Sequence, residues 1–185
     1  MKNASIFHGT DGTPNHFWIP WLKRQLTHTH NYGVWVPQLP QSDIPDLKVQ
    51  LPFVLKHGTY DNESVLVGHS AGCPLILSVL ENLNVKIKGA VLVAGFIENL
   101  SKVDKEPILQ KTYNWRKIKN NVENLFFINS DNDPWGCDDK AGRKMFDKLG
   151  GNLIIRHGEG HMGSDKFNQP YKKFPLLLKI IESFG

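Results

Sequence analysis

Apolar residues along this chain fall into short continuous runs, and segments with a helical repeat separate the runs. Six runs predict strands, at residues 4–7, 33–36, 64–67, 89–94, 125–129 and 152–155. Runs that are apolar on both faces are typical of parallel strands covered by helices on both sides of a sheet. The alternation of strands and helices predicts one α/β domain over residues 1–185, with about six parallel strands.

Between the strands, apolar residues recur every three or four positions, as they do on one face of an α-helix. The repeat predicts helices near residues 17–26, 47–55, 71–83, 138–149 and 171–184, the last kinked at Pro175. Residues 95–121 have no strong period.

Composition and charge narrow the function classes. The net charge of +4 comes without a Lys- and Arg-rich block interleaved with aromatic residues, which argues against nucleic-acid binding. No early apolar stretch resembles a signal peptide, and no run is long enough to cross a membrane. Two cysteines, Cys73 and Cys137, are too few for a disulfide framework, so we expect reduced thiols in a cytoplasmic protein.

The stretch 65–74 runs from an apolar strand through Gly-His-Ser-Ala-Gly into a helical pattern. A Ser at this position stands on a sharp strand-to-helix turn, the nucleophile elbow, with its hydroxyl exposed above the sheet. Only small residues fit two positions before and after it, which accounts for Gly68 and Gly72. Ser70 is therefore the candidate nucleophile, and His69 is expected to pack or to orient the turn.

A Ser hydroxyl needs a base that takes its proton and an acid that orients the base. On this kind of sheet the three residues follow in the order Ser, Asp or Glu, His. The loop after strand 125–129 holds Asp131 and Asp133, and the loop after strand 152–155 holds His157 and His161.

Asp133 is the preferred acid because it lies farther past the strand and Pro134 rigidifies its loop. Asp131 is the alternative, although such a residue commonly hydrogen-bonds its own turn. His161 is the preferred base because the Gly-rich residues 158–160 before it form a flexible loop, whereas His157 lies at the end of the strand.

Two backbone amides should stabilise the oxyanion that forms during attack, one after the nucleophile and one from the first strand's loop. The first is Ala71. For the second we favour Thr10 in the Gly-rich loop 8–14, with Asp11 as the alternative.

Three tryptophans lie near loops and could form an apolar substrate pocket. Trp135 is the best candidate because it follows Asp133 by two residues, and Trp115 is the second. Trp18 has helical spacing and is expected in the core. Other histidines lack the Cys or carboxylate spacing of a metal site, and the chemistry requires no metal or organic cofactor.

The opening residues 8–22, with their Pro-Asn-x-x-Trp-x-Pro-Trp pattern, are the most specific part of a resemblance that runs over nearly the whole chain. Together with residues 68–72, 130–134 and 158–161, they resemble the retinoblastoma-binding protein 9 / YdeN-like family of small serine hydrolases. The resemblance implies a compact α/β-hydrolase with a minimal lid or none, its nucleophile at Ser70, its acid at Asp133 and its base at His161. Members are described as esterases, sometimes with amidase or peptidase-like activity.

The retinoblastoma-binding name comes from a Leu-x-Cys-x-Glu segment. Neither Cys73 nor Cys137 lies in such a segment, so that partner is not expected here.

The sequence thus predicts a carboxylesterase for small-molecule esters with short- to medium-chain or aryl groups. The alternatives are an amidase or aminopeptidase-like hydrolase, and an interaction protein on a hydrolase scaffold. A thioesterase or a cofactor-free haloperoxidase would use the same residues. A dehalogenase needs Asp at the nucleophile position and is excluded by Ser70.

Overall fold

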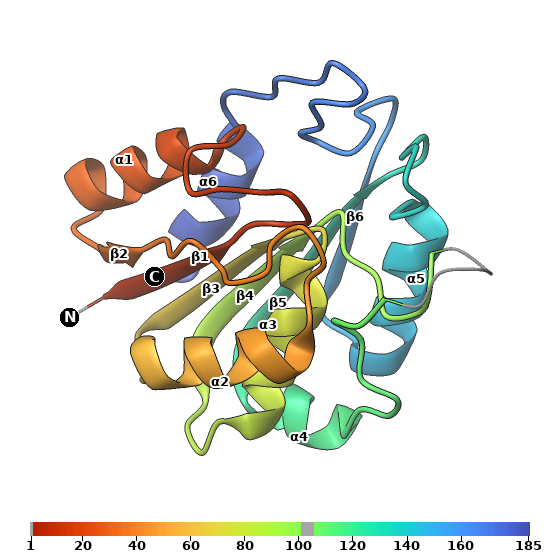
Figure 1. Cartoon of the computed structure of the whole chain (residues 1–185). Helices are drawn as coiled ribbons and strands as arrows, with labels where there is room; N and C mark the ends of the chain where they lie inside the picture. Colours follow the sequence, from red (N-terminus) through yellow and green to blue (C-terminus); the bar gives the residue numbers. More distant parts are fainter. Residues whose placement is uncertain (1, 101–105) are drawn as a thin grey trace.

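The computed structural model describes residues 2–100 and 106–185 (Figure 1). In these residues, six strands form one sheet in the order β2-β1-β3-β4-β5-β6, and every neighbouring pair is parallel. The α/β class and the six-stranded parallel sheet are confirmed. The strands are β1 (Asn3–Phe7), β2 (Gly33–Trp35), β3 (Ser64–His69), β4 (Ile87–Val93), β5 (Val122–Ser130) and β6 (Asn152–Arg156).

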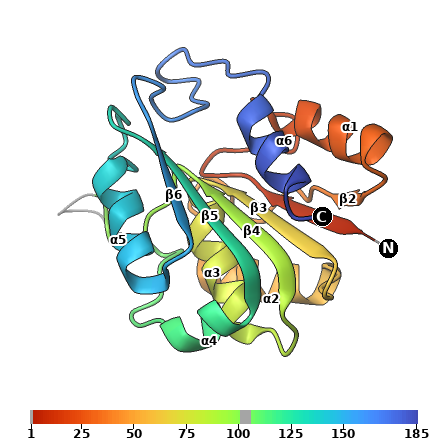
Figure 2. The same ribbon diagram turned by 180° about the vertical axis from the view of Figure 1, so that it is seen from behind.

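Helices cover both faces of the sheet. Two of them, α1 and α6, lie against one face, and the other four cover the opposite face (Figures 1 and 2). Right-handed crossovers account for the sides taken by α1 to α5, because the chain moves one way along the sheet from β1 to β2 and the other way from β2 to β6. The last helix, α6, follows β6 and is part of no crossover. The helices are α1 (Ile19–Thr29), α2 (Leu47–His57), α3 (Gly72–Asn82), α4 (Trp115–Asn120), α5 (Asp139–Leu149) and α6 (Pro175–Glu182).

The central strands carry the core. Every residue of β3 is buried, and so is every residue of β4 except Lys88. Since helices cover both faces, these strands cannot alternate apolar and polar residues. None of the helices in the described part of the chain combines the length and the hydropathy that a membrane span requires.

Pro175 begins the last helix and does not kink it. The predicted helix over 171–184 is therefore wrong at its start, since α6 spans Pro175–Glu182. Phe174 has φ −138° and ψ 75°, because the ring of a following proline disfavours the helical conformation. Proline is well suited to the first helical position, where its missing N–H has no partner to lose.

The segment 95–121 contains α4, which the hydrophobic pattern did not predict. Six residues are too few to show a helical repeat, and the Asn114 side chain caps the helix by accepting from the Lys117 amide. Residues 95–100 and 106–114 form no helix or strand. The expectation of a minimal lid also covers residues 101–105, which lie outside the described residues.

Candidate active site

The turn that carries Ser70 has the geometry of a nucleophile elbow. Because β3 ends at His69 and α3 begins at Gly72, Ser70 and Ala71 alone connect strand to helix. Ser70 has φ +52°, a left-handed conformation that costs a non-glycine residue free energy. Its amide donates to the Val93 carbonyl at 2.9 Å, which ties the turn to the end of β4.

Two glycines allow the close approach that this turn needs. A Cβ on Gly72 would lie 2.3 Å from the Phe7 carbonyl oxygen, so α3 passes directly against β1. A Cβ on Gly68 would lie 2.9 Å from the backbone carbonyl of Gly72. Larger side chains at either position would push the helix off the sheet and displace Ser70.

The loop after β1 lies against the same turn. A Cβ on Gly9 would be 2.8 Å from Cβ of Ser70. The Asp11 amide donates to the Ser42 carbonyl at 2.6 Å, so the alternative oxyanion donor is already engaged. The Thr10 and Ala71 amides have no acceptor within residues 2–100 and 106–185, and Thr10 lines the same cavity as Ser70.

His8 holds this loop in place. Its Nε2 accepts from the Leu39 amide at 3.1 Å, so the ring proton is on Nδ1, which donates to the Gly9 carbonyl at 3.0 Å. Burial lowers the pKa of His8, and the neutral ring can keep both bonds. The sequence pattern pointed to this loop, but it did not show this role of His8.

Asp133 and His161 meet in a buried pair. Nδ1 of His161 lies 2.7 Å from Oδ2 of Asp133, and the Asp133 side chain is fully buried. The other oxygen of Asp133 accepts from the Trp135 amide at 2.8 Å. An acid in this position holds the imidazole in one orientation and tautomer, with Nε2 free to accept a proton.

Asp131 and His157, the alternative acid and base, pair with each other at the surface. Their side chains lie 2.5 Å apart, and that of His157 is 97% exposed. Asp131 also accepts from the Gly158 amide at 2.9 Å, so it bonds the neighbouring loop. The amide and then His157 lower the pKa of Asp131, and its carboxylate raises the pKa of His157.

These pairs belong to a larger set of hydrogen bonds between the loops after β5 and β6. In this set, which we call the β5–β6 clasp, side chains of residues 130–133 bond to residues 157–161. Ser130 Oγ accepts from the Glu159 amide at 3.0 Å, and Asn132 Oδ1 accepts from the Gly160 amide at 2.8 Å. Sequence reasoning missed Ser130 and Asn132. The available signal was four consecutive polar residues directly after an apolar strand.

Three further side chains hold the backbone around His161 from other directions. His69 Nε2 donates to the His161 carbonyl at 2.9 Å, and Trp18 Nε1 donates to the Met162 carbonyl at 3.1 Å. Gln169 accepts from the His161 amide at 2.9 Å. Burial, with a smaller contribution from His161, lowers the pKa of His69 to about 3, so this ring stays neutral.

A cavity of about 380 Å³ opens at the carboxyl edge of the sheet, where ligands bind in folds of this type. The Ser70 hydroxyl and the His161 ring share it, although no hydrogen bond joins them in the described part of the chain. Such bonds are often long in unliganded sites and shorten when substrate binds. The apolar part of the wall is formed by Phe17, Ile19, Phe96, Leu100 and Trp135.

Of the three tryptophans considered for the pocket, Trp135 lines the cavity, whereas Trp18 and Trp115 do not. Trp135 lines the cavity, and its ring centroid lies 6.4 Å from that of His161. Trp18 is fully buried in the core, as expected. The prediction that Trp115 forms part of the pocket is wrong. Trp115 begins α4, which leads into β5, and therefore lies toward the amino ends of the strands, away from the cavity. There its ring centroid is 4.7 Å from that of Tyr113.

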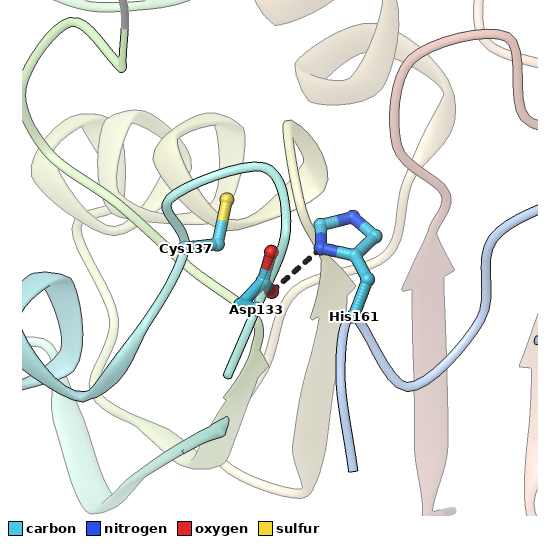
Figure 3. A group of neighbouring side chains, drawn as sticks. All are labelled: Asp133, Cys137 and His161. Carbon is cyan, nitrogen blue, oxygen red and sulfur yellow. Dashed lines mark hydrogen bonds and ion pairs between the residues drawn. The ribbon is translucent and has the colours of Figure 1, made fainter. Parts of the chain in front are cut away.

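A thiol completes the buried surroundings of the Asp–His pair. Cys137 lies on the same loop as Asp133, and ligand-type atoms of Asp133, Cys137 and His161 all lie within 4.8 Å of one another (Figure 3). Burial raises the pKa of Cys137 well above its usual value, and the charge of Asp133 adds to this. The four-residue spacing of Asp133 and Cys137 was the only sequence signal, because His161 joins them through the tertiary fold alone.

The strand order, the Ser-bearing turn after β3 and the Asp–His pair after β5 and β6 define an α/β-hydrolase. The model of the serine hydrolase family matches residues 4–180, and the chain belongs to that family. It is 26% identical to YdeN of Bacillus subtilis (strain 168), over 99% of this chain and 96% of that protein. It is 21% identical to the serine hydrolase RBBP9 of Rattus norvegicus, over 97% and 94% of the two chains. The resemblance to the RBBP9 and YdeN-like family is confirmed.

Solved structures show the same fold. The crystal structure of the ydeN gene product from B. subtilis has a TM-score of 0.88 at 24% identity, over 100% of this chain and 98% of that one. Est1E from Butyrivibrio proteoclasticus, bound to ferulic acid, has a TM-score of 0.72 at 12% identity, over 100% and 88% of the two chains. At these identities the likeness is one of fold alone.

Proposed function

We propose that this serine hydrolase is a carboxylesterase that uses Ser70 as nucleophile, His161 as base and Asp133 as orienting acid. The observation that carries the proposal is the placement of His161. Its ring is bonded at 2.7 Å to a buried carboxylate and shares a cavity with a Ser at φ +52° on a strand-to-helix turn.

In the proposed reaction, His161 Nε2 takes the Ser70 proton while Ser70 Oγ attacks the carbonyl carbon. The Thr10 and Ala71 amides stabilise the oxyanion, each contributing about 3 kcal/mol. His161 then protonates the leaving alkoxide, which departs and leaves an acyl-enzyme. Water attacks the acyl-enzyme with His161 again as base, and the acid product leaves with Ser70 regenerated.

Short- to medium-chain or aryl esters are the proposed substrates. A volume of about 380 Å³ lies toward the small end of ligand pockets, which span roughly 300–1,000 Å³. Its apolar wall, including the 40% exposed Trp135, suits an acyl or aryl group. Est1E and esterase PE8 share this fold and are esterases by name, which is consistent with the proposal.

The test is a chain-length series of p-nitrophenyl esters with the wild type and Ser70→Ala. We expect the highest kcat/KM at short to medium chains, and a loss of activity of at least about 1,000-fold in the variant. A maximum at long chains would contradict the substrate class. Hydrolysis by Ser70→Ala at the wild-type rate would contradict the nucleophile.

A fluorophosphonate probe separates the enzyme from the interaction-protein alternative. We expect the probe to label the folded wild type at Ser70, whereas a folded protein that resists labelling would favour a binding role. Panels of thioesters and aminoacyl amides, compared by kcat/KM, separate esterase from thioesterase and amidase.

A further inference from the structure

We propose that Asp133, Cys137 and His161 form a Zn²⁺ site whose occupation switches the hydrolase off. Carboxylate oxygen, thiolate sulfur and imidazole nitrogen are the donors that zinc prefers. The three groups are buried, and their donor atoms lie within 4.8 Å of one another. The inhibitory consequence rests on the proposed function, whereas the binding itself does not.

The distances are close to those of a zinc site. Zn–N and Zn–O bonds of about 2.0–2.1 Å and Zn–S bonds of about 2.3 Å place tetrahedral ligands about 3.3–3.8 Å apart. The bond of 2.7 Å between Asp133 and His161 has to open slightly, and the thiol has to move inward by at most about 1 Å. Water can take the fourth position.

Open space lies beside the loop that carries two of the three ligands, and Asn129 Nδ2 holds the main chain at Cys137 by donating to its carbonyl at 2.9 Å. Gly136, directly before Cys137, has φ +82°, and a Cβ placed there would meet nothing closer than 3.9 Å. In Figure 3 the Asp133 and Cys137 side chains come from one loop, and His161 faces them from another segment. A metal between them would therefore crosslink the loops after β5 and β6.

The position of the imidazole proton explains why zinc would inhibit. Nδ1 of His161 now faces Asp133, which leaves Nε2 as the proton acceptor. When zinc binds Nδ1, the imidazole proton moves to Nε2 and the Cys137 thiol releases its proton to solvent. An imidazole protonated at Nε2 cannot accept the Ser70 proton, so the base is blocked. The Cys137 thiol also hydrogen-bonds Ser70, so ligation of its sulfur changes this contact as well.

The donor set also predicts which ions act. Thiolate and imidazole suit Zn²⁺ and Co²⁺, whereas Mg²⁺ and Ca²⁺ prefer all-oxygen sites. We expect Zn²⁺ to inhibit ester hydrolysis, a chelator to restore it, and Mg²⁺ to have no effect at the same concentration.

The experiment compares wild type, Cys137→Ser, Cys137→Ala and a matched control, Cys73→Ser, all without a polyhistidine tag. Cys73 is the second buried thiol, and its Sγ bonds the Val93 carbonyl at 3.3 Å, outside the cluster. Zinc inhibition is expressed relative to each protein's own metal-free rate, and thermal unfolding checks that each variant folds. We expect the inhibition constant to rise at least about 10-fold in both Cys137 variants and to stay unchanged in Cys73→Ser.

Co²⁺ binding gives a readout that does not depend on activity. Wild type and Ser70→Ala should both show a thiolate-to-cobalt absorption band, and Cys137→Ser should not. Equal zinc inhibition of wild type and Cys137→Ser, or a wild type without this band, would overturn the metal site. Full esterase activity in Ser70→Ala would overturn the proposed function and leave the metal site standing.

Discussion

Replacing Gly72 by Ala tests how the fold holds the nucleophile. The new Cβ would lie 2.3 Å from the Phe7 carbonyl oxygen and 3.1 Å from that of His8. Both atoms belong to backbone at the end of β1, a strand with neighbours on both sides, so they cannot rotate away. An ordinary contact therefore requires α3 and β1 to separate by about 1 Å.

Two opposing effects set the magnitude. Overpacking of a well-packed core costs about 1–3 kcal/mol, and an immobile obstacle favours the upper end of that range. Ala gains up to about 1 kcal/mol over Gly in a helix. The free energy of unfolding should therefore fall by about 2 kcal/mol. Because Ser70 and Ala71 connect β3 to this helix, a displacement of about 1 Å should also lower kcat about 100-fold.

The assays are denaturant unfolding and p-nitrophenyl ester kinetics, with Gly33→Ala as the matched control. Gly33 lies on the edge strand β2, and a Cβ placed there would have its nearest neighbour, the Lys2 carbonyl oxygen, at 3.9 Å. We expect this control to stay within about 0.5 kcal/mol of wild type, with unchanged kcat. If Gly72→Ala behaved like Gly33→Ala in both assays, the role assigned to the close contact between α3 and β1 would be wrong.

Three further predictions concern the loops around the site. Asn132→Ala should lower the free energy of unfolding by about 1 kcal/mol and reduce kcat, because a clasp amide loses its acceptor; unchanged unfolding and kinetics would contradict this. His69→Phe should lower kcat with little change in KM, because the hydrogen bond to the His161 carbonyl is lost. His69→Gln should recover part of the loss, because its amide can donate to that carbonyl. Equal kcat in the two variants would argue against a role of this hydrogen bond. The pKa of His157 is raised, so its contribution to stability is present below about pH 6.5 and is lost as the pH rises above this value. The pKa of Asp131 is lowered, so its contribution is present above about pH 4 and is lost as the pH falls below this value. Thermal unfolding should therefore show the largest difference between wild type and Asp131→Asn near pH 5–6, and a difference independent of pH would refute the pairing.

The hydrophobic pattern was sufficient for the layers of the fold. Continuous apolar runs marked the covered strands, because a parallel strand buried on both faces has no polar side. Element ends were less accurate, since they depend on capping and on local geometry. Pro175 shows this: the apolar repeat continues through it, but the ring constrains the preceding residue and begins the helix there.

The candidate site was predictable where chain order and small residues define it. Gly68 and Gly72 mark the elbow because the helix can approach the strand only without side chains at these positions. The pairing of Asp133 with His161 also agrees with the preference derived from loop position. Trp115 was misplaced because sequence proximity to a strand does not say at which end of the sheet a residue lies.

By itself, the sequence determined the alternation of strands and helices, the elbow at Ser70 and the loops that bring an acid and a base to it. These features depend on local periodicity and on residues with special backbone requirements. The tertiary structure alone decided that Asp131 pairs with His157, that the Asp11 amide is engaged, and that Cys137 joins the buried pair. The reason is physical: such contacts join segments far apart in the chain, and only the packed sheet and helices set their distances.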